Sequence, residues 1–275
     1  MPGEAFETVN SELSRAEFQK ISGLLYAVSR ITLQDGKEEL VKSRLLKRMR
    51  AIGIRSFGEY LARVDGDPAE KYQMVDLLTT NKTSFFREDA HFDFLKTRVL
   101  PGLGGGRLRV WSAGCSSGEE PYTIAMVLRE YYAQGPQPDA RILATDLSKR
   151  VLARAEAGTY DEEVLREVPA QLASKYFDCV ETRKPRRYSA RQALRSLITF
   201  APLNLMEDWP MKGPFDVIFC RNVMIYFDKA TQERLVNRFY GLLKPGGYLF
   251  SGHSESLAGM NHSFRYVQPA VHLKG

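Results

Sequence analysis

The sequence predicts an α/β protein: a doubly wound, mostly parallel sheet of the Rossmann-like type, with a small all-helical domain before it and a small β insertion within it. Two observations predict this. From residue 107 onward, short apolar segments alternate with amphipathic helical patterns, which is typical of a sheet covered by helices on both faces. Before that point, apolar residues recur at intervals of three and four, the period of a helix.

The first part of the chain is expected to form helices over 14–30, 37–53, 56–64 and 69–81, separated by Gly, Asp and Pro. They make up a predicted helical domain over 1–80. Residues 81–106 contain an amphipathic stretch at 88–100, then Pro101 and a glycine-rich run, and are expected to link the two domains. The second domain is predicted to cover 107–275.

In the second domain, strands are predicted at 108–114, 141–148, 197–205, 215–223 and 246–253. Helical patterns lie between them at 119–133, 149–157 and 229–243. The charged stretch 160–196 interrupts this alternation, and we expect it to form a small β insertion with a hairpin.

Composition limits the class of protein. The 275 residues contain no apolar run near the roughly 20 residues that cross a bilayer, and the first residues lack the order of a signal peptide, so we expect a cytoplasmic chain that is not membrane-inserted. The three cysteines and four histidines show no metal-ligand spacing, so no metal is expected. The net charge of +6 suits an acidic partner.

The loop after the first predicted strand indicates the kind of ligand. A pyrophosphate-binding turn has the pattern Gly-x-Gly-x-x-Gly, whereas here only Gly114 and Gly118 are present. Glu119 and Glu120 would repel a phosphate at the start of the following helix. The loop therefore favours a ligand that has no phosphate and carries a positive charge.

Polar residues at the other strand ends extend this interpretation. Asp146 is placed to accept hydrogen bonds from two ribose hydroxyls, and Asn204 can read the edge of an adenine. With Glu119 attracting a cation, the set predicts S-adenosylmethionine. The alternative is that Asp146 only caps the next helix and that the glycine loop is an ordinary turn.

Five strings carry a resemblance to a known family: "NKTSFFRE" (81–88), "AGCSSGEEPY" (113–122), "APLNL" (201–205), "FDVIFCRNVMIYFD" (215–228) and "LKPGGYLFSGHSES" (243–256). In this order they resemble the CheR-type chemotaxis receptor methyltransferases, which esterify receptor glutamates. The resemblance implies that the 81–106 segment contributes to the active site and that the chain acts on chemoreceptor cytoplasmic helices. It also implies a set of cofactor-contacting residues: Asn81, Thr83, Arg87, Glu119, Asp146, Asn204, Leu205, Asn222 and Val223. Gly114 of the glycine loop completes the predicted cofactor site.

Arg87 and Tyr226 fall where the family delivers the methyl group. A glutamate carboxylate is already an anionic nucleophile at neutral pH, so the transfer needs positioning rather than a general base. Arg87 suits bidentate binding of a carboxylate, and the Tyr226 hydroxyl can fix the oxygen that is not methylated. The alternatives are a surface ion pair of Arg87 with Glu88 or Asp89, and a buried aromatic role for Tyr226. His253 is expected to be structural.

The family uses its N-terminal domain to contact the receptor helix. The pattern predicts a helix that starts with Asp35 and Glu38 and stops at Gly53, with Arg44, Lys47 and Arg48 as receptor contacts. The alternative is a solvated charged face. In some family members the β insertion docks a receptor peptide through a glycine-bearing loop, but "TRKPRRYS" here has no glycine, which argues against such docking.

Two other functions remain open from the residues alone. One is a methyltransferase directed at RNA or another nucleic acid, and the other is a non-catalytic signalling adaptor. The basic residues are not interleaved with stacking aromatics, so no nucleic-acid partner is expected. A monomer is expected.

Overall fold

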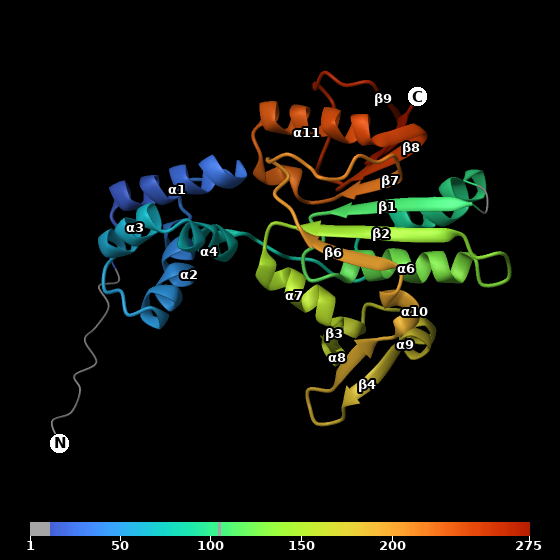
Figure 1. Ribbon diagram of the computed structural model, residues 1–275, viewed down its shortest axis with the longest axis horizontal. Helices are drawn as coiled ribbons and strands as arrows, with labels where there is room; N and C mark the ends of the chain where they lie inside the picture. The colour runs from blue at the N-terminus through green and yellow to red at the C-terminus, as the bar shows by residue number, and fades with distance from the viewer. Residues whose placement is uncertain (1–11, 104–105) are drawn as a thin grey trace. The chain divides into compact units, whose positions relative to one another are not determined.

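The computed structural model describes residues 12–103 and 106–275, and it divides into two compact units (Figure 1). The first consists of the chain up to Thr80 together with Tyr226–Asp228. The second consists of Asn81–Ile225 and Lys229–Gly275. Residues 1–11 of the predicted helical domain and 104–105 of the glycine-rich run lie outside the described residues.

Between residues 12 and 80 the first unit forms the helices α1 (Arg15–Ser29), α2 (Glu38–Ala51), α3 (Phe57–Gly66) and α4 (Pro68–Leu78). Side chains cap three of them. Ser14 and Glu17 form a capping box on α1, while Ser56 and Asp67 accept hydrogen bonds from the first amides of α3 and α4. The unit also includes Tyr226–Asp228: the Thr32 amide donates to the Tyr226 carbonyl at 3.0 Å.

Helix α2 buries an apolar stripe made of Val41, Leu45 and Met49, which recur at an interval of four residues. Its predicted start with Asp35 is wrong. The helix begins at Glu38 after Lys37, which forms no side-chain cap, because Gly36 turns the chain between Asp35 and the helix with a φ of +85°.

The second unit is built on a seven-stranded sheet with the order β6-β2-β1-β7-β8-β10-β9. Its strands are β1 (Arg107–Ala113), β2 (Asp139–Asp146), β6 (Ile198–Pro202), β7 (Phe215–Cys220), β8 (Leu243–Ser251), β9 (Phe264–Gln268) and β10 (Val271–Lys274). The first five strands in this order pair in parallel, which confirms the predicted fold class. In Figure 1, β1 and β2 run side by side with their arrowheads in the same direction.

Helices α6 (Glu119–Tyr131), α7 (Lys149–Ala157) and α11 (Lys229–Leu242) follow the parallel strands, as predicted. The antiparallel strands β9 and β10 were not predicted. They complete one edge of the sheet, with β10 paired to both β8 and β9. Among the described residues, no helix has the length and apolar character that crossing a bilayer requires.

The β insertion is confirmed and is larger than a hairpin. It consists of β3 (Thr159–Asp161), α8 (Glu162–Leu165), α9 (Ala170–Tyr176), β4 (Phe177–Glu181), β5 (Arg187–Ala190) and α10 (Gln192–Arg195). Strands β4 and β5 form the hairpin, and β3 adds a third antiparallel strand on the other side of β5. Figure 1 shows this small sheet as a yellow lobe beside the main sheet.

The segment expected to be a linker is part of the core of the second unit. It forms α5 (Ala90–Phe94), the π-helix η1 (Leu95–Val99) and the short 3-10 helix η2 (Leu100–Gly102). Phe85, Phe92 and Leu95 are buried in the hydrophobic core. Phe85 meets Tyr160 and Phe177 edge to face, with ring centroids 5.0 and 5.8 Å apart, so this segment also holds the β insertion.

His272 on β10 generates a pH prediction. The residue is 6% exposed, neither ring nitrogen has a hydrogen-bond partner, and burial lowers its pKa to about 4. Between about pH 6.5 and pH 4 the unfolded chain binds a proton here that the folded chain does not. The free energy of unfolding should therefore fall as pH falls through this window, by about 1.4 kcal/mol per pH unit from this one group.

Urea unfolding of the parent and of His272→Leu at several pH values between 4.5 and 7 measures this contribution. The variant should show the shallower slope. Equal slopes for the two proteins would contradict the assignment.

Candidate cofactor site

The site lies where four parallel strands end. Because β6, β2, β1 and β7 are neighbours and parallel, the residues that follow them meet at one edge of the sheet. Gly114, directly after β1, has a φ of +87°, and a Cβ added to it would lie 2.4 Å from Cγ2 of Val223. The loop after β1 therefore needs glycine here to approach the turn after β7.

Asp146 at the end of β2 joins two loops. Its Oδ2 accepts a hydrogen bond from the Ser116 amide at 2.8 Å, and its Oδ1 accepts one from the Ser148 amide at 2.9 Å. Ser148, rather than Asp146, caps α7 by accepting a bond from the Val151 amide. The helix-cap alternative for Asp146 is thus wrong. A carboxylate oxygen can accept more than one hydrogen bond, and a ribose diol offers two donors.

Asn204 and Leu205 follow β6 and are nearly buried, each 8% exposed. The Asn204 Oδ1 accepts from the Met206 amide at 3.0 Å and its Nδ2 donates to Glu207 at 3.1 Å, so its side chain is held in one orientation. The Leu205 carbonyl accepts from Arg238 at 2.7 Å. The Leu203 amide donates to the Asp146 carbonyl at 2.9 Å, which places the end of β6 beside the end of β2.

The segment that begins at Asn81 lies against the glycine loop. The Ser116 hydroxyl donates to the Asn81 carbonyl at 3.1 Å, and the Phe86 amide donates to the Thr123 hydroxyl of α6 at 3.2 Å. Thr83 lies half-buried between these two anchors. The segment before α5 thus reaches the same edge of the sheet as the strand ends.

The two glutamates at the start of α6 have different partners. Glu119 is 5% exposed and accepts from the Ser117 hydroxyl at 2.8 Å, and burial raises its pKa. Glu120 pairs with Arg221 at 3.1 Å and accepts from the Ser112 hydroxyl at 2.7 Å. Both acids were expected to repel a phosphate, but Glu120 instead neutralises the charge of Arg221.

Sequence reasoning did not assign a role to the side chain of Arg221, which is 2% exposed. The guanidinium pairs with Glu88 at 3.2 Å and with Glu120, donates to the Arg87 carbonyl, and lies 5.4 Å from the centre of the Phe92 ring. Burial alone would raise the pKa of Glu88, but the Arg221 charge and hydrogen bonds, including one from Asn222, lower it. Residue spacing in the sequence cannot reveal these pairs, because the partners lie far apart in the chain.

The turn after β7 is held by a second buried acid. Asn222 has a left-handed φ of 59°, its amide donates to Glu255 at 2.8 Å, and its Nδ2 donates to Glu88 at 3.2 Å. The Ile225 amide donates to the other Glu255 oxygen at 3.2 Å, at the start of the 3-10 helix η3 (Met224–Tyr226). Glu255 is 6% exposed, and burial raises its pKa.

Arg87 is half-buried, and its Nη1 donates to the Lys82 carbonyl at 2.8 Å. Within residues 12–103 and 106–275 it forms no ion pair with Glu88 or Asp89, so that alternative is wrong: Glu88 pairs with Arg221 instead. Tyr226 is half-buried rather than fully buried, so its alternative role as a buried aromatic is also wrong.

The predicted receptor contacts on α2 lie in the first unit and differ from one another. Arg44 donates to the carbonyls of Leu78 and Thr79, each at 2.8 Å. Arg48 forms a two-bond ion pair with Glu70, at 3.0 and 2.6 Å. Lys47 is exposed. Arg44 and Arg48 thus stabilise the helical unit itself, a role that their prediction as receptor contacts did not include.

The parallel sheet and the strand-end loops, with a glycine loop in place of a phosphate cradle, define an S-adenosylmethionine-dependent methyltransferase. Residues 81–272 match the family described as "CheR methyltransferase, SAM binding domain", and residues 16–79 match "CheR methyltransferase, all-alpha domain". The chain belongs to the CheR methyltransferase family. Its cofactor is S-adenosylmethionine.

Curated relatives cover most of the chain. The chemotaxis protein methyltransferase of Klebsiella aerogenes is 45% identical over 258 residues, which is 92% of this chain and 87% of that protein. The probable chemotaxis protein methyltransferase of Rhizobium etli is 44% identical over 243 residues, covering 86% of this chain and 91% of that protein. The chemotaxis protein methyltransferase of Escherichia coli is 41% identical over 255 residues, covering 92% and 88%.

Asp146→Ala should weaken cofactor binding. The substitution removes the proposed acceptor of two ribose hydroxyls, a loss on the order of 1.5–3 kcal/mol in binding free energy. Calorimetry with S-adenosylhomocysteine measures it, and Asp139→Ala, at the opposite end of the same strand, serves as the control. An unchanged dissociation constant for Asp146→Ala would remove this residue from the site.

Proposed function

We propose that this chain transfers the methyl group of S-adenosylmethionine to glutamate side chains on the cytoplasmic region of chemoreceptors. The products are glutamyl methyl esters and S-adenosylhomocysteine, and the chain acts in the cytoplasm as a monomer. The names of its relatives support a substrate in chemotaxis. One observation on Arg87 supports a carboxylate as the substrate group. In the part of the chain that the structure describes, the Arg87 guanidinium forms no ion pair with an acidic side chain.

The chemistry follows from that observation. A glutamate oxygen attacks the sulfonium methyl group in line, the carbon–sulfur bond breaks, and its electrons stay on the sulfur, which becomes neutral. No proton moves, so the site needs no base. Arg87 holds the substrate carboxylate or the carboxylate of the cofactor, and Tyr226 donates to the substrate oxygen that does not attack.

The test uses cofactor labelled in the methyl group and a receptor cytoplasmic fragment. Mild base should release the label as methanol, because a carboxyl ester hydrolyses and a methylated amine or nucleobase does not. Label that stays on the receptor fragment after base would contradict ester formation. Label found only on added RNA would favour the nucleic-acid alternative, and no label transfer to either would favour the non-catalytic adaptor.

Arg87→Lys and Tyr226→Phe should lower turnover by at least about tenfold, a rise in the activation barrier of about 1.4 kcal/mol. Lysine keeps the charge but loses the two-pronged geometry, and phenylalanine loses only the hydroxyl. Steady-state kinetics together with S-adenosylhomocysteine affinity separates the roles, because an Arg87 that serves the cofactor would also change that affinity. Tyr266→Phe, at a tyrosine that is 65% exposed, is the matched control. Parent turnover in both variants would show that the proposed pair is wrong.

We assign residues 1–80 to receptor recognition. Residues 37–50 contain six basic and two acidic residues, and an acidic receptor helix is a fitting partner. The exposed Lys47 remains a proposed chief contact. Because Arg44 and Arg48 have partners inside the unit, the exposed Arg50 takes their place beside it.

Lys47→Glu combined with Arg50→Glu should raise the receptor KM at low salt without changing Tm. Exposed charges are screened over roughly 8 Å at physiological salt, so the difference from the parent should shrink as salt rises. Arg48→Glu is the contrasting variant: it places an acid beside the buried Glu70 and should lower Tm. If the double variant methylates receptor fragments with parent KM at low salt, the helix is a solvated face.

A further inference from the structure

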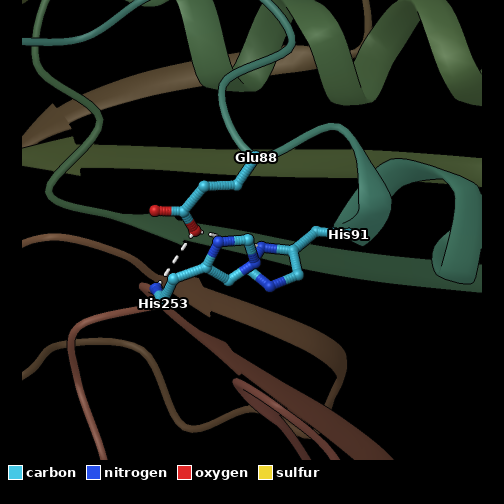
Figure 2. Close-up of side chains that lie close together, drawn as sticks. All are labelled: Glu88, His91 and His253. Carbon is cyan, nitrogen blue, oxygen red and sulfur yellow. Dashed lines mark hydrogen bonds and ion pairs between the residues drawn. The ribbon is translucent and has the colours of Figure 1, made fainter.

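Glu88, His91 and His253 lie together in the second unit (Figure 2). Glu88 lies in the segment that leads into α5 and His91 lies in α5 itself, whereas His253 follows β8, much later in the sequence. Each residue offers one possible metal-binding atom, and these three atoms all lie within 4.8 Å of one another. No other such group of His, Cys, Asp and Glu side chains is found among residues 12–103 and 106–275.

The spacing fits a transition-metal ion. The Nδ1 of His91 is 3.5 Å from Oε2 of Glu88, and the rings of His91 and His253 are 4.9 Å apart between centroids. Ligand atoms bound at about 2.05 Å in a tetrahedral site lie about 3.3 Å from one another. The Glu88–His91 pair is already near this separation, and the exposed His253 side chain can close the remaining distance.

A second observation points to a ligand here. His91 is 1% exposed, yet neither of its ring nitrogens has a hydrogen-bond partner. Its ring packs edge-on against Phe250, with centroids 5.6 Å apart. Buried polar atoms without partners are rare and costly. Nδ1 faces the Glu88 carboxylate, so an ion bound beside that carboxylate would satisfy it.

We propose that Glu88, His91 and His253 bind one transition-metal ion of the zinc class. Two imidazoles and a carboxylate are ligands that Zn²⁺ accepts, and the exposed His253 side leaves the remaining position to water. Magnesium and calcium prefer oxygen ligands and should not compete.

The contacts of Arg221 with Glu88 determine how a bound ion would affect the cofactor site. The guanidinium is 3.2 Å from the same Glu88 oxygen, and Asn222 donates to the other one. A bound ion competes for Glu88 with these two groups and with the His253 amide, which donates to the same oxygen as Arg221 at 3.3 Å, while Arg221 keeps Glu120 and the Arg87 carbonyl as partners. Occupancy therefore disturbs the turn after β7, and we expect zinc to weaken cofactor binding rather than assist the reaction.

The experiment is a titration of the purified full chain with Zn²⁺ at neutral pH, followed by calorimetry. It uses a Cys179→Ser background, because that thiol is exposed and could bind zinc. In this background, His253→Gln should lose at least about tenfold in zinc affinity. His262→Gln, which removes a histidine near His272 outside the cluster, should not. Thermal unfolding without metal checks that each variant is folded.

The second readout is the S-adenosylhomocysteine dissociation constant with and without saturating Zn²⁺. It should rise with zinc in the background protein and not in His253→Gln. Equal zinc affinity in the background protein and His253→Gln would overturn the site. Zinc binding that leaves the dissociation constant unchanged would overturn the coupling to the cofactor.

Discussion

The cofactor site depends on the ion pairs of the buried Arg221 guanidinium. Burying a charge costs free energy unless the charge is paired and hydrogen-bonded, so a buried arginine side chain requires acidic partners. Arg221 pairs with Glu88 and Glu120, and it also donates to the Arg87 carbonyl. The end of β7, the start of α6 and the segment before α5 are thereby joined. Left-handed backbone at Phe86, Glu88 and Asn222 lies in these joined segments, where surrounding contacts can hold it.

Around that constraint the acids of the site have separate tasks. Glu120 and Glu88 neutralise Arg221, and Glu255 accepts backbone amides of the turn after β7. Asp146 connects the loops after β1 and β2 through the Ser116 and Ser148 amides. Arg87, adjacent in sequence to Glu88, is left without an acidic partner among the described side chains because its neighbour serves Arg221. The proposed catalytic role of Arg87 thus follows from how the buried charges are paired.

The helical unit uses its charges in the same way. Arg48 pairs with Glu70, which also accepts from the Tyr60 hydroxyl and is only 4% exposed. The Arg48 hydrogen bonds lower the pKa of Glu70 despite its burial. Arg44 binds carbonyls that α4 leaves without helical partners near its end. A basic run along one helix therefore divides into residues that stabilise the fold and residues that remain available to a partner.

Sequence alone determined the features that depend on local pattern. Residue periods predicted the helices α1–α4, α6, α7 and α11 and the five parallel strands, but not the short helices of the β insertion. The glycine loop and strand-end residues predicted the cofactor, because topology brings the ends of parallel strands to one edge. The strands β3, β9 and β10 are too short, or too unlike a buried strand, to show a period. Tertiary structure alone decided how side chains distant in the sequence pair. In the sequence, Arg221 is separated by 101 residues from Glu120 and by 134 residues from Arg87, whose carbonyl accepts its hydrogen bond. His253 lies close to Glu88 and His91 because the loop after β8 runs beside the start of α5. Such pairings follow from strand order and burial, which no local pattern encodes.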